Sequence, residues 1–339
     1  MRLNLVTGGC GFIGRHLVGQ LAARGERVRV LDLRPLNPLP PGVEQMIGSI
    51  ADPAAAARAV EGCERVFHLA ANPNLWDHDP GVFDLVNHQG TRRMLEAAQK
   101  AGVQRFVYTS TESILKSCRA PRSSSRALID ESVRLTLADM PGPYCRSKFL
   151  AEEAAREAAA GGLPVVIVNP TMPIGPGDQL LTPPSKMILG FLNGDTPAYL
   201  DCEFNIVDAR DVAAGQILAI EKGRIGERYI LGNVNLKLGD LLDKLHRMTG
   251  LPMPRMRIPY GLALASAVVS EGISAITRKP PMAPLTGVRL ARTSMAFDSS
   301  RARNELGWSC RPLEESLRDA IDWMSGRRLL RRQAALAVA

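Results

Sequence analysis

The feature that most constrains the fold is a glycine-rich turn near the first residue. A short apolar strand is expected over 2–6, and it runs directly into TGGCGFIG at residues 7–14. Leu17, Leu21 and Ala22 follow at helical spacing. Glycines between a strand and a helix permit a tight turn and bring the backbone close to a pyrophosphate at the helix N-terminus. The segment therefore predicts a dinucleotide-binding strand, turn and helix.

A second apolar strand, over 27–31, ends in an acid that suggests which dinucleotide binds. Asp32 stands 18 residues after Gly14, a spacing suited to a carboxylate that binds ribose hydroxyls. The same carboxylate would repel the 2′-phosphate of NADP, although Arg34 could receive that phosphate. The pair favours NAD(H) and leaves NADP(H) open.

Further apolar and helical segments alternate along the chain, as in a doubly wound parallel sheet. We expect strands over 43–47, 66–71 and 105–111, and helices over 53–60 and 87–100. The last strand ends in the hydroxyls Thr109-Ser110-Thr111, and ligands collect at this end of parallel strands. His68 lies inside an apolar strand, so we interpret it as a hydrogen-bonded, partly buried residue and not as a base.

A proton donor is expected in the helix that begins near Tyr144 and runs to about Gly161. Tyr144 and Lys148 stand four residues apart, on one helix face. An ammonium close to a phenol lowers its pKa from ~10, which lets a tyrosine exchange a proton with a substrate oxygen. A Tyr-x-x-x-Lys pair alone is more often a surface contact, so this interpretation depends on the nucleotide-binding turn before it.

In order and spacing, these motifs resemble the extended short-chain dehydrogenase/reductases of the NAD-dependent epimerase/dehydratase family. The resemblance implies that Thr111 holds the substrate oxygen, Tyr144 is the acid/base, and Lys148 binds the nicotinamide ribose and lowers the tyrosine pKa. It also implies a set of cofactor-binding residues: Gly8, Gly11, Phe12, Ile13, Gly14, Asp32, Arg34, Ser49, Ile50, Leu69, Ala70, Ala71, Asn87, Tyr144, Lys148, Asn169 and Pro170. Ser49 departs from the family, which usually has an aspartate there.

The same resemblance implies an α/β fold, a Rossmann-type doubly wound parallel sheet with a smaller mixed α/β substrate-binding part. Residues 1–170 would form the NAD(P)-binding domain with the catalytic tyrosine and lysine. Residues 171–326 would mainly bind substrate, with some segments returning to the Rossmann core, and 327–339 would form a basic and apolar tail. Relatives often dimerise through a four-helix interface, which implies a homodimer.

The segment 165–178 resembles the dihydroflavonol-reductase branch, including the hopanoid-associated sugar epimerases and a bacterial ketoreductase of ceramide synthesis. We therefore expect an NAD(P)H-dependent reductase of a keto group on an amphipathic, lipid-like precursor. A keto-sphingoid, an oxidised ceramide and a hopanoid-linked compound are examples. A nucleotide-sugar epimerase or dehydratase with tightly bound NAD is the alternative. A non-catalytic nucleotide-binding protein would not need Thr111, Tyr144 and Lys148 together.

Two apolar segments of the C-terminal half carry less specific predictions. Residues 180–193 are expected to form a loop and an apolar helix, either as the wall of an apolar pocket or as ordinary core packing. Residues 259–276 are expected to form a helix too polar to span a membrane. We interpret it as a core helix, with a lipid-binding cleft or a bilayer contact as alternatives.

Composition narrows the partners and the compartment. The net charge is +8, but the basic residues are dispersed and aromatic residues are only 5%, which argues against nucleic acid. Attraction to anionic substrates or to an anionic membrane surface fits better. The six cysteines are scattered, which predicts reduced thiols and no metal site. No signal peptide or membrane span is recognised, so we expect a cytoplasmic protein, with peripheral contact at the inner membrane face as an option.

Overall fold

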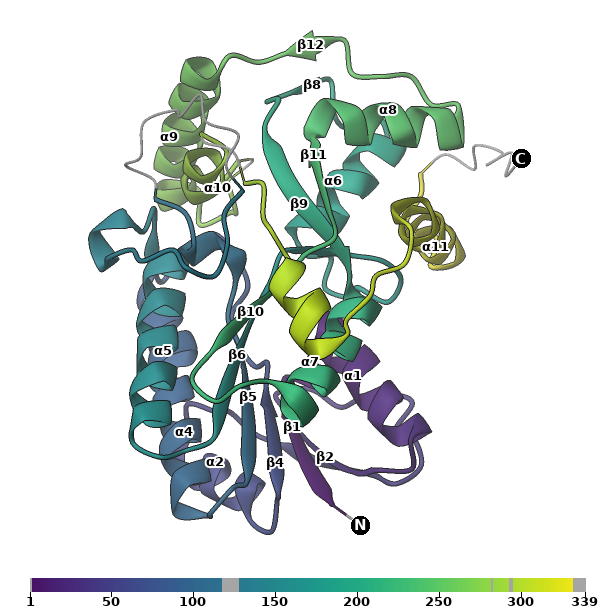
Figure 1. Ribbon diagram of the computed structural model, residues 1–339. Coiled ribbons are helices and arrows are strands. Elements are labelled where there is room, and N and C mark those ends of the chain that lie inside the picture. Colours follow the sequence, from purple (N-terminus) through teal and green to yellow (C-terminus); the bar gives the residue numbers. More distant parts are fainter. Residues whose placement is uncertain (1, 118–127, 282, 293–294, 332–339) are drawn as a thin grey trace.

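A seven-stranded parallel sheet forms the centre of the protein. The computed structural model describes residues 2–117, 128–281, 283–292 and 295–331. The strands of the sheet are β1 (Leu3–Thr7), β2 (Arg27–Asp32), β3 (Val43–Ile47), β4 (Arg65–His68), β5 (Arg105–Thr109), β6 (Val165–Pro170) and β10 (Arg228–Leu231). Their order is β10-β6-β5-β4-β1-β2-β3 (Figure 1). The predicted doubly wound parallel sheet is confirmed. Its strands are apolar on both faces, so both faces must be covered by other elements.

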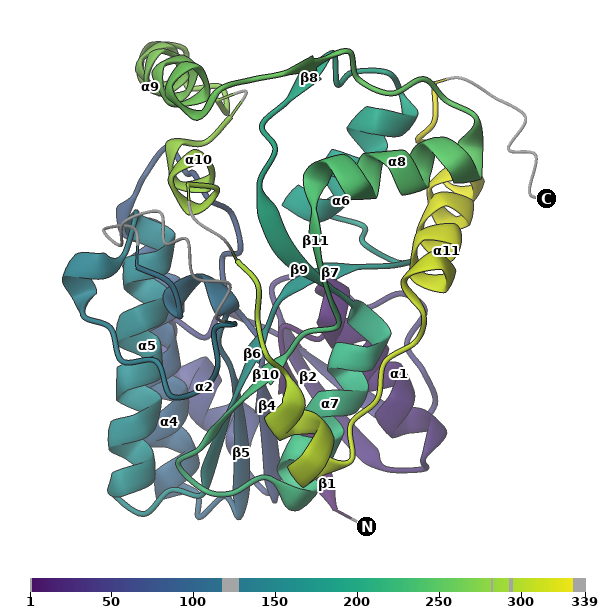
Figure 2. The same ribbon diagram turned by 45° about the horizontal axis from the view of Figure 1, so that its top comes forward.

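Helices supply that cover (Figure 2). One face carries α1 (Phe12–Ala23) and α7 (Ala209–Lys222), and the other carries α2 (Pro53–Val60), α4 (Gly90–Lys100) and α5 (Pro143–Ala160). A short helix, α3 (Gly81–Phe83), and a π-helical turn over Asp84–Gln89 lead into α4. Successive strand residues point to opposite faces: Val6 joins the apolar cluster beneath α1 and α7, while Leu5 joins the cluster beneath α2, α4 and α5.

The later part of the chain builds a smaller mixed region above the carboxyl ends of the large sheet. β7 (Met172–Ile174), β9 (Glu203–Asp208) and β11 (Val234–Lys237) form one small sheet, and β8 (Ala198–Tyr199) pairs with β12 (Met256–Arg257). The helices here are α6 (Pro183–Leu192), α8 (Leu238–Thr249), α9 (Tyr260–Thr277), α10 (Leu285–Leu290) and α11 (Leu313–Gly326). Two 3₁₀ turns, Glu112–Ile114 and Leu137–Asp139, and a π-helical turn over Ala302–Leu306 complete the elements.

Several later segments return to the large sheet. β10 pairs with β6, and α7 covers the face beside α1. The indole N–H of Trp308 donates to the Asp211 carbonyl at 2.8 Å, which packs the closing segment onto α7. In the predicted tail, residues 327–339, the backbone amide of Arg331 donates to Asn193 Oδ1 at 2.8 Å. Residues 332–339 lie outside the described residues.

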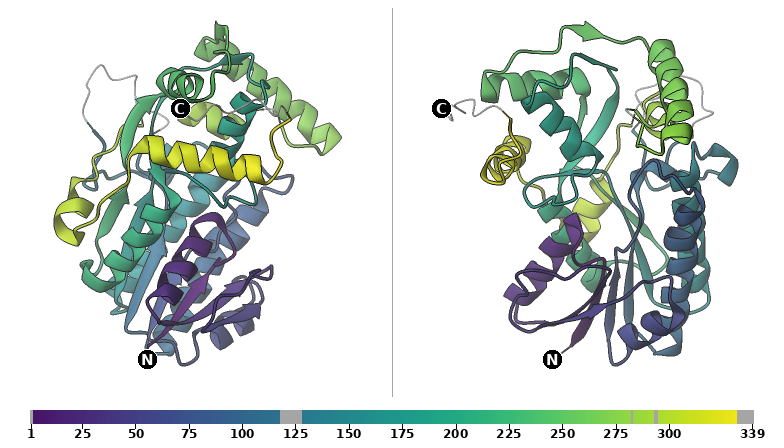
Figure 3. Two further views of the ribbon diagram at one scale, coloured as in Figure 1. Left: turned by 90° about the vertical axis from the view of Figure 1, so that its right-hand side faces the viewer. Right: turned by 180° about the vertical axis from the view of Figure 1, so that it is seen from behind.

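Helix α9 corrects two predictions. We expected a core helix, yet among its 18 residues only Ala267 and Ser274 are buried. We also expected no span, yet by length and composition this helix, with a mean hydropathy of 1.3, is long and apolar enough to cross a membrane. Ser266, Ser270 and Ser274 lower the mean hydropathy of the helix little, and Glu271 is its one charged residue. Figure 3 shows the green helix at the outer edge of the molecule, above α5.

Candidate active site

The glycine turn between β1 and α1 is packed too closely for side chains. Gly8 has a φ of +71°, and a Cβ there would lie 2.8 Å from the backbone of Ala70. A Cβ on Gly14 would lie 2.1 Å from the Gly8 carbonyl oxygen. No side chain caps α1 at Gly11, so the first amides of the helix can receive an anion. The turn is compact and its helix N-terminus is uncapped, as the prediction requires, and the binding of a pyrophosphate there stays a prediction.

The acid at the end of β2 lies beside this turn. Asp32 Oδ2 accepts the backbone N–H of Cys10 at 2.9 Å, and Oδ1 accepts that of Arg34 at 3.3 Å. Burial, with the Asp32 carboxylate adding to it, raises the pKa of the Cys10 thiol to about 12, so this thiol is neutral. The Arg34 side chain is exposed, and it has no ion-pair partner among the described residues. Asp32 thus lies against the glycine turn, and the binding of a cofactor ribose or 2′-phosphate by Asp32 and Arg34 stays a prediction.

The end of β3 completes this side of the predicted cofactor site. Ser49 Oγ accepts the Ala51 amide at 3.1 Å, a local turn contact. Ile50 is buried, and a Cβ on Gly90 would lie 2.8 Å from its side chain. Gly90 thus allows α4 to approach the loop after β3.

The end of β4 holds a buried histidine between two threonines. His68 Nδ1 lies 2.7 Å from Thr7 Oγ1, and Nε2 lies 3.0 Å from Thr91 Oγ1. Because the Thr91 hydroxyl donates to the Asn87 carbonyl at 2.6 Å, it accepts from Nε2–H. Burial, and to a lesser extent Lys148, lowers the pKa of His68 to about 3. The prediction of a hydrogen-bonded histidine is confirmed, but the residue is fully buried and not partly buried. That His68 takes no part in catalysis stays a prediction.

Two predicted cofactor residues lie behind the cavity wall. Asn87 Oδ1 accepts the Asn72 amide at 2.7 Å, and its Nδ2 donates to Ser147 Oγ at 3.1 Å. Asn169 Nδ2 donates to the Thr111 carbonyl at 3.1 Å and to Glu152 Oε2 at 2.9 Å. Both side chains are fully buried. They fix the elements that carry the site, and their direct contact with a cofactor stays a prediction.

The three predicted catalytic residues meet at one cavity of about 350 Å³. Thr111 follows β5, and Tyr144 and Lys148 come from the first turns of α5, which begins with Pro143 at a favoured position. Lys148 Nζ donates to the Thr109 carbonyl at 2.7 Å. Predicted cofactor residues also line this cavity: Ile13, Leu69, Ala71 and Pro170.

The tyrosine in this cavity is a neutral acid. Burial raises the pKa of Tyr144 above its usual value, the charge of Glu112 raises it further, and the hydrogen bond with Thr111 opposes them. Burial lowers the pKa of Lys148 to about 7, against the charge of Glu152. A neutral phenol can donate a proton to a substrate oxygen. In this arrangement the pKa of Tyr144 is raised and not lowered, so the predicted lowering by Lys148 is not seen in the protein alone.

Two acids near these residues were not identified from the sequence. Glu112 follows Thr111, whose hydroxyl donates to Glu112 Oε2 at 2.9 Å, and burial raises the pKa of Glu112 to about 7. Glu152 lies one turn beyond Lys148 and accepts from Arg228 at 3.1 Å and from Arg156 at 2.8 Å. The four-residue spacing from Lys148 could have indicated Glu152. Nothing local indicated Arg228.

Apolar side chains form the wall that faces Thr111 and Tyr144. Pro183, Pro184 and Met187 of α6 line the cavity, as in the pocket-wall alternative for residues 180–193. Ile188 and Phe191 of the same helix instead pack in the core. Other apolar residues of the wall are Leu75, Met172, Pro173, Phe204, Leu238, Leu290 and Met295. Among the described residues, the charged side chains of the lining are Glu112, Lys148 and Glu203.

Fold and site together define a nucleotide-dependent enzyme with a tyrosine and lysine pair. The chain belongs to the NAD-dependent epimerase/dehydratase family, whose model matches residues 4–232. With its reductase-named relatives, this makes the protein an NAD(P)-dependent oxidoreductase of the extended short-chain dehydrogenase/reductase type.

Three relatives of known name are similar over nearly their whole length. A Synechocystis protein named for dihydroflavonol 4-reductase is 38% identical, over 94% of this chain and 93% of its own. Sterol demethylase protein B of Methylococcus capsulatus is 33% identical, over 96% and 99%. The 2-alkyl-3-oxoalkanoate reductase of Stenotrophomonas maltophilia is 30% identical, over 93% and 97%.

Solved structures share the fold. The crystal structure of gox2253 has a TM-score of 0.83 and 34% identity, over 98% of this chain and 100% of that one. DesIV, a dTDP-glucose 4,6-dehydratase from Streptomyces venezuelae solved with NAD bound, has a TM-score of 0.77 and 27% identity, over 97% and 98%. NAD thus binds to a structural neighbour of this chain.

Proposed function

We propose that the protein is an NAD(P)H-dependent ketoreductase that acts on an amphipathic, lipid-like ketone. The apolar wall opposite Thr111 and Tyr144 carries this proposal, because it offers dispersion contacts to a hydrocarbon chain and few polar partners. Relatives named for a sterol demethylase and an oxoalkanoate reductase support the same class of substrate. A keto-sphingoid, an oxidised ceramide and a hopanoid-linked ketone are within this class.

The charges of the cavity favour this substrate over a nucleotide sugar. A nucleotide sugar carries a pyrophosphate, which in proteins is commonly paired with arginine or lysine. Here, within the described part of the chain, the lining supplies two acids, Glu112 and Glu203, and one cation, Lys148. An ionised Glu112 or Glu203 would repel the pyrophosphate, whereas an uncharged ketone avoids this cost.

The side chains supply the proton and the orientation. Thr111 and Tyr144 hold the substrate oxygen, and Tyr144 donates its proton as negative charge develops there. Lys148 stabilises the tyrosinate that remains. When bound, NAD(P)H supplies the hydride, and the glycine turn, Asp32 and Arg34 are the residues that would hold its diphosphate and ribose. The apolar wall excludes water from the reacting carbonyl.

The test offers purified protein a keto-sphingoid or a 2-alkyl-3-oxoalkanoate in detergent and, separately, UDP-sugars. We expect stoichiometric loss of NADH absorbance with the lipid ketone. NADH should be preferred to NADPH if Asp32 dominates, and Arg34→Ala should then affect only the reaction with NADPH. Interconversion of a sugar without net loss of cofactor would overturn the proposal in favour of an epimerase or dehydratase, the reaction for which DesIV is named.

The remaining assignments concern assembly and location. We propose a cytoplasmic homodimer that pairs α4 and α5 of two copies, by analogy with the family. We also propose peripheral contact with a membrane, because a lipid-like substrate partitions into bilayers. Sedimentation velocity and cell fractionation test these two assignments.

A further inference from the structure

The hydroxyl group of Thr111 has several hydrogen-bonding partners in the catalytic cavity. It donates to Glu112 Oε2 at 2.9 Å, and the Ser113 amide donates to it at 3.3 Å. The Tyr144 hydroxyl also bonds it. A threonine hydroxyl offers one proton and two lone pairs. The partners of Thr111 therefore compete for a small number of places.

A substrate oxygen bonded to Thr111 and Tyr144 would enter this competition. The Ser113 amide occupies one lone pair of Thr111, and the Ser113 hydroxyl, 3.1 Å away, can rotate toward other partners. One proton and one lone pair of Thr111 then remain for Glu112 and the substrate. The protonation state of Glu112 decides how these two places are shared.

The two states of Glu112 suit the two forms of one substrate. Ionised Glu112 can only accept hydrogen bonds, so it takes the Thr111 proton, and the remaining lone pair of Thr111 can accept the hydroxyl proton of an alcohol. Neutral Glu112 can donate its carboxyl proton to that lone pair, which leaves the Thr111 proton for a ketone oxygen. A ketone oxygen accepts hydrogen bonds and donates none, so it needs this second arrangement.

The charge of Glu112 changes near neutral pH. Burial raises the pKa of Glu112 to about 7, against the hydrogen bond from Thr111 and the smaller effect of the Lys116 charge. Burial also lowers the pKa of Lys116 to about 7, and Lys116 Nζ donates to the Leu290 carbonyl at 2.7 Å. Two neighbouring groups therefore titrate in the same range, and a variant of Glu112 is needed to separate them.

Other titratable side chains line the catalytic cavity. Tyr144 and Lys148 come from α5, and Cys202 and Glu203 come from the beginning of β9 and the residue before it. Burial raises the pKa of Tyr144 and of Cys202, for Cys202 to about 11, so both are neutral near pH 7. Burial lowers the pKa of Lys148 to about 7, so its titration accompanies that of Glu112.

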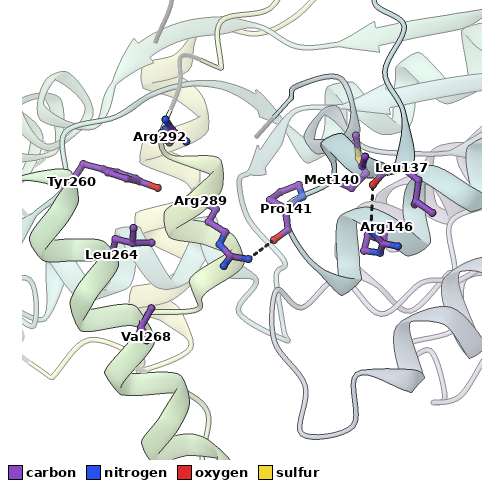
Figure 4. A pocket seen from close by; sticks show the side chains of 10 residues that line it. Leu137, Met140, Pro141, Arg146, Tyr260, Leu264, Val268, Arg289 and Arg292 are labelled. Carbon is purple, nitrogen blue, oxygen red and sulfur yellow. Dashed lines mark hydrogen bonds between the residues drawn. The ribbon is translucent and has the colours of Figure 1, made fainter. Parts of the chain in front are cut away.

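Helix α10 borders the catalytic cavity without adding a charge to it. Gly287 and Leu290 of this helix line the catalytic cavity. Arg289 of α10 and Arg292 beyond its end line a different cavity of about 760 Å³, together with Arg146 of α5 (Figure 4). These basic side chains thus belong to another cavity than Glu112.

We propose that Glu112 is a positioning residue that sets which form of the substrate Thr111 binds better: neutral Glu112 favours the ketone, and ionised Glu112 favours the alcohol. This inference rests on the proposed function and names its regulation by pH. Tyr144 remains the proton donor. Because binding and protonation are linked, the enzyme binds the ketone and releases the alcohol more readily below pH 7 than above it.

The affinities of complexes that cannot react test the proposal. The probes are an oxidised ceramide with NAD⁺ and the corresponding ceramide with NADH, in detergent, because neither lipid titrates between about pH 5.5 and 8.5. Calorimetric titration of the protein with each lipid gives the two Kd values. As pH rises through 7, we expect the Kd of the ketone to rise about fivefold and that of the alcohol to fall about fivefold.

Two glutamine variants assign these changes to one carboxyl group. In Glu112→Gln the amide can donate to Thr111 at every pH, so most of both changes should disappear and the ketone should stay favoured. Glu131→Gln is the matched control. Glu131 is also a buried acid, 7% exposed, with a raised pKa, and its Oε1 accepts the Ile230 amide at 2.8 Å. It does not line the catalytic cavity, so this variant should retain both changes.

A valine at position 111 tests whether Glu112 acts through Thr111. Thr111→Val removes the hydroxyl and keeps the shape of the side chain. In this variant, adding Glu112→Gln should alter the ratio of the two Kd values by less than about twofold, because the coupling through Thr111 is absent. An equal effect of Glu112→Gln in both backgrounds would overturn the proposal, since the charge of Glu112 would then act directly.

Infrared titration provides a readout without substrate. The carbonyl band of the neutral carboxyl group, assigned with Glu112→Gln, gives the pKa of Glu112 in the protein with NADH bound. Thr111→Val should raise this pKa, because the hydroxyl no longer donates to the carboxylate. An unchanged pKa would contradict the hydrogen bond on which the proposal depends.

Failure of this inference and failure of the proposed function have different signatures. Wild type that reduces no lipid ketone would refute the proposed function. Wild type that reduces the oxidised ceramide, but binds ketone and alcohol with the same pH dependence, would refute the role of Glu112 alone.

Discussion

Helices α5 and α9 are equally long, 18 residues each, yet they place their side chains in opposite ways. In α5 a stripe of polar and charged residues, Tyr144, Lys148 and Glu152, faces inward. In α9 the apolar stripe faces outward. Hydropathy alone would assign both helices wrongly, because burial depends on the partners that the rest of the chain supplies.

Each buried charge of α5 has such a partner. Lys148 donates to the Thr109 carbonyl, and Glu152 binds Asn169, Arg156 and Arg228. These contacts offset the cost of removing charge from water. On α9, the exposed apolar residues Leu262, Val269, Ile273 and Ile276 have no equivalent partner among the described residues. The predictions below test each half of this contrast.

The largest effect is expected from the inward stripe of α5. Tyr144→Phe removes the proton donor and should lower kcat by about 10² to 10⁴, with the Kd for NADH unchanged. Tyr199→Phe is the control, because Tyr199 is buried outside the catalytic cavity. Stopped-flow turnover and fluorescence titration with NADH separate the two quantities. If Tyr144→Phe kept most of its activity, the acid would be a different residue.

The second-largest effect, on the free energy of unfolding, is expected from removing the buried charge of Glu152 on α5. The Glu152 side chain is 2% exposed and pairs with Arg228, which is 8% exposed. Glu152→Gln leaves this guanidinium uncompensated and should lower the free energy of unfolding by about 3–5 kcal/mol. The neighbouring Glu153, 51% exposed, is the matched control, and Glu153→Gln should stay within about 0.5 kcal/mol. Urea unfolding measures both, and equal effects would show that burial of this carboxylate is unimportant.

The contrast also explains which parts could be predicted from the sequence. The glycine turn, Asp32, and the Tyr144 and Lys148 pair are local patterns, and the structure places the turn and Asp32 together and the pair at one cavity. Glu152 and Arg228 are 76 residues apart, so only the folded chain brings them into contact. The orientation of α9 could not be read from its composition, because a core helix and an interfacial helix use the same residues.

A smaller, pH-dependent effect is expected where Glu112 lies near the stripe. Its pKa of about 7 means that it is neutral below and ionised above this pH. Ionised Glu112 raises the pKa of Tyr144 and opposes negative charge on the substrate oxygen. The rate of reduction should therefore fall at least about tenfold as pH rises through 7, and Glu112→Gln, which mimics the neutral acid, should make this fall smaller. The fall that remains in the variant belongs to Lys148, whose pKa is also about 7.

Stability provides an independent readout of the same group. The pKa of Glu112 is raised from 4.5 to about 7, so the unfolded chain ionises first. Glu112 then destabilises the fold increasingly between these values and constantly above them. The melting temperature of Glu112→Gln should exceed that of wild type by a margin that grows from pH 4.5 to 7. A constant margin would mean that Glu112 does not titrate in this range.

The smallest effect is expected on the outward stripe of α9. Ile276 is 85% exposed, so Ile276→Ala removes little packing and should change the free energy of unfolding by less than about 0.5 kcal/mol. Ile321 of α11 is the matched helical isoleucine, 4% exposed, and Ile321→Ala should cost about 2–5 kcal/mol. Urea unfolding in the absence of lipid compares the two. If both variants lost the same stability, the apolar side of α9 that carries Ile276 would be covered in solution, and the contrast between α5 and α9 would not hold.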